Sequence, residues 1–188
     1  MKMKYFVFIL LLVIELECFA EEKKPARFHV ALDYRYNLGL RERSDLWTLK
    51  RGTNKMGGNS IHLTFLYHVT SRITAGAGFG LDGYTSPSHN SRFVFGTVRY
   101  RPLKKCLNSY LYTNLGYSFT IMQSSLTSGW HWDAGIGYTK MFARHFGLNC
   151  QFGYNLRQFK YTVRERPFIS YDVNSLRHSL SLGVGVVF

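Results

Sequence analysis

Eight segments in which apolar and polar residues alternate constrain the fold of this chain more than any other feature. A β-strand directs successive side chains to opposite faces, so this period-two pattern predicts strands with one apolar and one polar face. Each segment is long enough for a tilted strand to cross a bilayer, which takes about ten residues. The expected strands are Ala26–Leu40, Gly58–Thr70, Ile73–Tyr84, Arg92–Arg101, Tyr110–Thr120, Trp130–Met141, His145–Tyr161 and Val173–Phe188.

The fourth segment is the one whose register the sequence leaves open. In one alternative Val94 and Val98 face outward and Arg99 faces inward. In the other, Phe93 and Phe95 face outward, and a β-bulge would allow a mixture of the two. We take the first alternative as the prediction.

The connections between the segments differ in length on the two sides of the expected sheet. Those after the second, fourth and sixth segments are short or medium, whereas the others are longer, above all Arg41–Gly57 and Thr162–Asp172. Short turns at one end and longer loops at the other are typical of outer-membrane barrels. The pattern predicts an all-β fold, an eight-stranded antiparallel up-and-down transmembrane β-barrel with both termini at the short-turn end.

The first twenty residues have the features of a secretory signal peptide. Lys2 and Lys4 form a basic start, Tyr5–Ile14 is an apolar run, and Cys18–Ala20 resembles a cleavage site. The apolar run is shorter than the roughly 20 residues that a membrane-spanning helix needs. The sequence therefore predicts a signal peptide over residues 1–20 and one barrel domain over residues 21–188.

The composition of the polar face distinguishes a membrane barrel from a soluble one. A soluble, lipocalin-like periplasmic barrel would expose a face rich in Lys and Glu. Here that face consists mainly of Gly, Ser, Thr, Asn and His, and aromatic residues make up 16% of the chain. Large aromatic side chains near both ends of the segments suggest two interfacial girdles. We expect the apolar face to contact lipid and keep the soluble barrel as the alternative.

Charged residues on the expected inner face predict a neutral network. Three carboxylates and three guanidiniums are tolerable in a narrow lumen only if they pair with one another. Eight strands enclose little more than side-chain volume, so we expect a plugged lumen and keep a narrow porin as the alternative. The six residues are Asp33, Arg35, Asp82, Asp133, Arg157 and Arg177.

The net charge of +13 is concentrated in part in the expected outer loops. Basic loops can contact the phosphates of lipopolysaccharide, although simple solvation explains them equally well. Export argues against a nucleic-acid partner, and we expect a monomer surrounded by outer-membrane lipids. The candidate lipopolysaccharide contacts are Arg41, Arg43, Lys50, Arg51, Lys55, Lys160, Arg164 and Arg166.

The histidines do not form a convincing site for a metal or for catalysis. His62 and His68 share a face but lie about 20 Å apart along a strand. An outer-membrane lipid-modifying enzyme is a further alternative, with the outward-facing His178 as its candidate residue. Its neighbours Ser179 and Ser181 are expected to face inward, and no acid is expected beside it. We predict no cofactor, no metal and no enzymatic activity.

The final strand resembles the signal by which the outer-membrane barrel assembly machinery recognises its clients. Leu182, Val184 and Val186 alternate before the terminal Phe188, with glycines between them. Short pieces such as 135–138 and 147–154 are similar to the outer-membrane β-barrel domain family, and the size is similar to the small OmpX/OmpA-type barrels. The resemblance implies outer-membrane residence and insertion by that machinery, and it implies no shared activity.

Overall fold

The computed structural model describes residues 27–103, 106, 108–119, 128–143, 146–166 and 169–188. They form one antiparallel sheet, and within these ranges no helix is long and apolar enough to cross a bilayer. The strands are β1 (Phe28–Ser44), β2 (Thr48–Lys50), β3 (Gly57–His68), β4 (Ile73–Thr85), β5 (His89–Tyr100), β6 (Ser109–Phe119), β7 (Gly129–Ala143), β8 (Phe146–Arg166) and β9 (Ile169–Val187).

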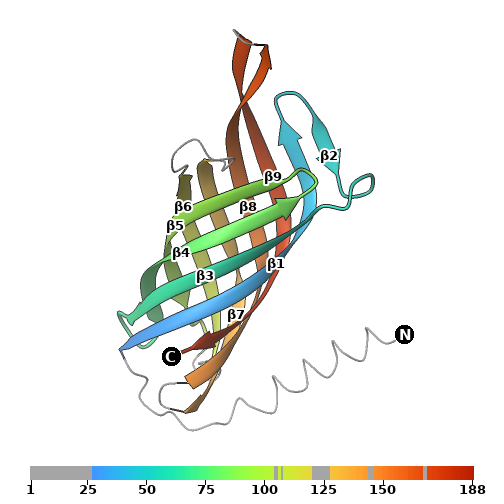
Figure 1. The fold of residues 1–188 in the computed structure, drawn as a ribbon. Coiled ribbons are helices and arrows are strands. Elements are labelled where there is room, and N and C mark those ends of the chain that lie inside the picture. Colours follow the sequence, from blue (N-terminus) through green and yellow to red (C-terminus); the bar gives the residue numbers. More distant parts are fainter. Residues whose placement is uncertain (1–26, 104–105, 107, 120–127, 144–145, 167–168) are drawn as a thin grey trace, which may run out of the picture.

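The sheet closes on itself because β1 pairs with both β3 and β9 (Figure 1). The remaining long strands pair with their sequence neighbours, so eight strands form the barrel. The short β2 adds to β1 at the end of the barrel that carries the longer connections, which we call the outer end. The backbones of Val30 and Phe188 exchange two hydrogen bonds beside the closing seam. Closure leaves no unpaired strand edge in the barrel wall, as a lipid environment requires. The predicted eight-stranded barrel is confirmed, whereas the signal peptide predicted over residues 1–20 lies outside the described residues and stays a prediction.

The register of β5 follows the first of the two alternatives. Phe93 and Phe95 are buried in the lumen, whereas Val94 and Val98 are about half exposed on the outside. Arg99 also lies inside. The alternation is unbroken along β5, so no bulge is needed to explain it.

The prediction of long loops is wrong in part for three of the connections. β4 and β5 are joined by a turn of only three residues, 86–88. β1 continues to Ser44 before the short β2 begins. The segment expected as a loop over Thr162–Asp172 is a paired ladder, in which β8 and β9 continue as a hairpin beyond the barrel rim (Figure 1). A hydrogen bond from the Thr162 hydroxyl to the Asp172 carboxylate supports this hairpin.

The barrel is polar inside and apolar outside. Large apolar side chains remain exposed along every long strand, and the buried positions between them carry mostly polar or charged side chains. A soluble barrel has the reverse arrangement, because water favours a polar exterior. The soluble, lipocalin-like alternative is therefore wrong, and the exterior is suited to lipid.

Aromatic side chains on the exterior have polar ends that find partners. The Tyr34 hydroxyl donates to Asn59 Oδ1, and the Trp132 indole donates to Thr113 Oγ1. Rings that combine an apolar body with a satisfied polar end suit the depth of lipid headgroups.

Candidate functional site in the lumen and at the outer rim

Among the residues that the structure describes, eight buried charged side chains project into the lumen. The sequence predicted six of them and missed Glu42 and Arg99 as members of the network. Glu42 had been assigned to a loop, whereas it lies in β1 beyond a bulge at Gly39–Arg41, which no sequence pattern revealed. These eight side chains balance four carboxylates (Asp33, Glu42, Asp82, Asp133) against four guanidiniums (Arg35, Arg99, Arg157, Arg177).

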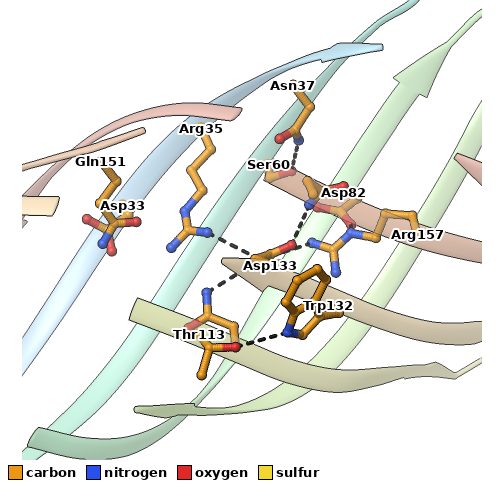
Figure 2. A network of polar contacts seen from close by, with 12 residues as sticks. Asp33, Arg35, Asn37, Ser60, Asp82, Thr113, Trp132, Asp133, Gln151 and Arg157 are labelled. Carbon is orange, nitrogen blue, oxygen red and sulfur yellow. Dashed lines mark hydrogen bonds and ion pairs between the residues drawn. The ribbon is translucent and has the colours of Figure 1, made fainter. Parts of the chain in front are cut away.

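The middle of the lumen is organised around Asp133 (Figure 2). Its Oδ2 lies 3.3 Å from Arg35 Nη1 and 4.0 Å from Arg157 Nη2. Arg157 Nε also lies 2.9 Å from Asp82 Oδ2. The Asn155 amide donates to Asp133 Oδ1 at 2.6 Å. These contacts join β1, β4, β7 and β8 across the interior.

Asp33 belongs to a separate group nearer the short turns. Its Oδ1 accepts a hydrogen bond of 2.6 Å from the Asn149 amide, whereas Arg99 Nη2 lies 4.0 Å from Oδ2. The Tyr110 hydroxyl donates to Asn149 and accepts from Gln151. The Asn149 amide is therefore hydrogen-bonded to this carboxylate, Tyr110 and Gln151 continue the chain of hydrogen bonds from Asn149, and one guanidinium lies farther away.

Arg177 lies apart from the three aspartates and pairs with Glu42 at the outer end. Its Nη1 is 3.3 Å from Glu42 Oε2, and both side chains are fully buried. Glu42 Oε1 also contacts His89 Nε2 and accepts from the Ser175 hydroxyl. The Arg177 guanidinium also donates hydrogen bonds to the backbone carbonyls of Gly57 and Thr85. The expected single network is thus divided among three levels.

Aromatic rings pack against all four guanidiniums. The guanidinium carbon of Arg157 lies 4.4 Å from the Phe93 ring centre, and that of Arg177 lies 4.8 Å from Tyr84. Arg99 and Arg35 pack similarly on Tyr110 and Tyr112. Such contacts add cation–π attraction where the charges are removed from water.

His62 and His131 pack among rings at the centre of the lumen. His62 lies 5.1 Å from the Phe93 ring and 5.2 Å from the Phe95 ring, and His131 lies 4.4 Å from Phe93. Within the part of the chain that the structure describes, the ring nitrogens of both histidines make no hydrogen bond. These histidines therefore act as packing groups.

The described residues, the other histidines included, contain no group of three or more side chains that could hold a metal ion. His178 lies half-buried on the outer face, where its Nδ1 shares a hydrogen bond with the Tyr154 hydroxyl. Ser179 and Ser181 are buried in the lumen. The absence of enzymatic activity stays a prediction.

The basic residues expected to contact lipopolysaccharide lie at the outer end. Arg41, Arg43, Lys50, Lys55 and Lys160 are exposed. Arg51 is exposed too, although its Nη1 donates to the carbonyl of Met56. The side chains of Arg164 and Arg166 lie outside the described residues.

The expected assembly signal occupies the turn-side end of β9 and the residue after it. Leu182, Val184 and Phe188 are exposed on the outside, Val186 is half-buried, and β9 pairs with both β1 and β8. The recognition role of these residues stays a prediction.

A closed barrel of eight antiparallel strands, polar within and apolar without, is the fold of the small outer-membrane β-barrel proteins. The solved structures similar to this chain include the outer-membrane protein OprG of Pseudomonas aeruginosa, with 11% identity, 87% of this chain and 95% of that chain covered, and a TM-score of 0.53. Neisserial surface protein A is similar at 13% identity, with 86% and 99% covered and a TM-score of 0.48. The outer-membrane protein AlkL is similar at 15% identity, with 90% and 94% covered and a TM-score of 0.49.

No protein-family model and no curated protein sequence matches the chain. The likeness to OprG supports the fold, and the chemistry of the site rests on the residues described above.

Proposed function

We propose that this chain is a resident of the outer membrane whose closed lumen has a structural role and whose basic outer surface contacts lipopolysaccharide. The observation that carries the first half is the pairing of the lumen charges. Each of the four guanidiniums has a carboxylate within 4.0 Å and an aromatic ring beneath it. Paired, immobilised charges leave little freedom for a passing solute to exchange with them.

The volume of an eight-stranded barrel supports the same proposal. Side chains alone can fill a lumen of this size. Here Tyr84, Phe93, Phe95 and Phe159 are all buried inside, in contact with histidine rings or guanidiniums. A narrow porin would instead line a continuous path with mobile polar groups.

Conductance across a planar bilayer tests the closed lumen. We expect the wild-type barrel to give no defined single-channel step. A variant with Tyr84→Ala and Phe93→Ala, which removes two large lumen rings, serves as the opened comparison once heat-modifiable mobility shows that it has folded. A defined step from the wild-type protein would contradict the proposal and favour the narrow porin.

The second half of the proposal rests on the exposed cations at the outer end. Each Lys or Arg near an anionic membrane surface contributes about 1 kcal/mol of attraction. Binding of the purified barrel to vesicles with and without lipopolysaccharide tests this contact. Equal binding to both would contradict it.

A further inference from the structure

The exterior of β2, β1, β9 and β8 gathers basic side chains in adjacent rows at the outer end. Arg41 pairs in register with Lys50 of β2 on one side and with His178 of β9 on the other. Arg43, two residues along, pairs with Thr48 and Leu176. Residues opposite one another in a ladder carry their side chains on the same face, so these cations are neighbours.

The bulge in β1 is responsible for this arrangement. Before the bulge, odd-numbered residues such as Asn37 and Gly39 face the lumen. A strand without the bulge would continue that alternation and direct Arg41 and Arg43 inward. The register shift between Gly39 and Arg41 instead exposes both arginines and buries Glu42.

The rows carry more positive than negative charge. Arg41, Arg43, Lys50 and Lys160 are exposed here, and the exposed carboxylates near them are Asp45, in the groove lining, and Asp172, which pairs with Thr162 two residues beyond Lys160. Among the residues that the structure describes, no ion pair joins any of the four cations to a carboxylate. Like charges directly opposite one another, as Arg41 and Lys50 are, destabilise a ladder unless an anion lies between them.

A groove of about 390 Å³ opens among these rows. Its volume lies in the range of ordinary ligand sites. Trp130 belongs to the same exterior, and the row nearer the membrane centre continues with Leu156 and Trp132. The groove lining includes Arg41, Arg43, Trp130, Gln158, Asn174 and His178.

We propose that this groove binds a phosphate group of a glycolipid in the outer leaflet, with the lipid's acyl chains lying along the barrel exterior. The inference rests on the proposed function and names the site of that contact. Guanidiniums bind phosphate oxygens through paired, charge-assisted hydrogen bonds. A membrane lipid is favoured over a soluble anion because the groove adjoins the apolar exterior of the barrel. A ligand with acyl chains can contact that exterior while its phosphate lies in the groove, whereas a soluble anion contacts the groove alone.

Native mass spectrometry of the purified barrel, titrated with diphosphoryl lipid A, tests the proposal. Replacing Arg41→Gln and Arg43→Gln together removes two exposed charges and should weaken binding about 30-fold. The control is Arg72→Gln with Arg92→Gln, which also removes two positive charges; Arg72 is half-buried in the short turn between β3 and β4. Arg92 is exposed on the opposite wall between Leu81 and Phe119, with no basic cross-strand neighbour. The control should bind as the wild type does.

Further arms separate this site from the proposed function. Monophosphoryl lipid A should bind the wild type more weakly, and excess inorganic phosphate should not displace the lipid. If Arg51→Gln with Lys55→Gln removes binding while the variant with Arg41→Gln and Arg43→Gln retains it, the groove is not the binding site. The proposed contact with lipopolysaccharide would then still stand. If the wild type does not distinguish lipid A from an unphosphorylated lipid, both proposals are wrong. Displacement by inorganic phosphate would identify a soluble anion as the ligand and overturn the lipid assignment.

Discussion

Glu42 and Arg177 lie directly opposite one another across the closing seam of β1 and β9, and their side chains form a fully buried ion pair. The bulge that turns Glu42 inward is the same one that exposes Arg41 and Arg43. A single irregularity in one strand therefore shapes both the outer end of the lumen and the exterior beside it.

Removing the carboxylate of this pair should destabilise the barrel strongly. Glu42→Ala leaves the Arg177 guanidinium buried without its counter-charge, and breaking a buried pair in this way costs about 3 kcal/mol. The free energy of unfolding in guanidinium chloride, measured with the barrel in lipid vesicles, should fall by that amount. As a comparison, Asp172→Ala removes an exposed carboxylate that accepts a hydrogen bond from Thr162, and it should lower the free energy of unfolding by less than about 1 kcal/mol.

The double variant Glu42→Ala with Arg177→Met distinguishes pairing from packing. It removes both charges, so it should be more stable than Glu42→Ala alone, because no unpaired charge remains. Additive losses from the two substitutions would show that the pair has no coupling and would contradict this account.

Much of the fold could be predicted from the sequence because side-chain alternation is a direct consequence of strand geometry. Strand positions and the inward direction of Asp33, Asp82 and Asp133 follow from that rule alone. The pairing of Arg177 with Glu42 could not be predicted in this way, because a bulge in β1 reverses the alternation without an obvious sequence signal. The ladder between Thr162 and Asp172 was also missed, since polar composition resembles that of a loop.

A glycine in the wall between β7 and β8 should be intolerant of any side chain. Gly135 lies opposite Gly153, and a Cβ on Gly135 would meet the Phe152 carbonyl oxygen and approach Gly153 Cα to 2.5 Å. Gly135→Ala should lower the unfolding free energy by about 2 kcal/mol, since backbone has to shift to admit the methyl group. The same denaturant titration measures it.

Gly96→Ala provides the matched comparison in the same barrel. Gly96 faces outward, and the nearest atom to a Cβ there lies 4.0 Å away. This substitution should be neutral or stabilising by about 0.5 kcal/mol, because alanine restricts the unfolded chain. Equal losses at both positions would show that close approach of the strands is not the cause.

The hairpin of β8 and β9 should face the cell exterior. Thr162 is exposed on this hairpin, and Ser71 is exposed in the short turn between β3 and β4 at the opposite end. A membrane-impermeant maleimide should label Thr162→Cys on intact cells, and Ser71→Cys only after permeabilisation. The parent chain, in which Cys150 is a free and exposed thiol, gives the background. Labelling in the reverse order would invert the orientation and exclude lipopolysaccharide contact at this end.

Phe188 should matter more for assembly than for the finished barrel. Phe188 is about half exposed, and its ring lies 6.3 Å from that of Phe146. Its backbone hydrogen bonds to Val30 do not depend on the side chain, so Phe188→Ala should change the free energy of unfolding by less than about 1 kcal/mol. Insertion into membranes that contain the assembly machinery should instead slow several-fold, as pulse-chase of folded protein would measure. Phe146→Ala removes the neighbouring ring without altering Phe188 and should insert at the wild-type rate. If both variants insert equally slowly, exterior aromatic packing governs insertion and Phe188 is not part of a recognition signal.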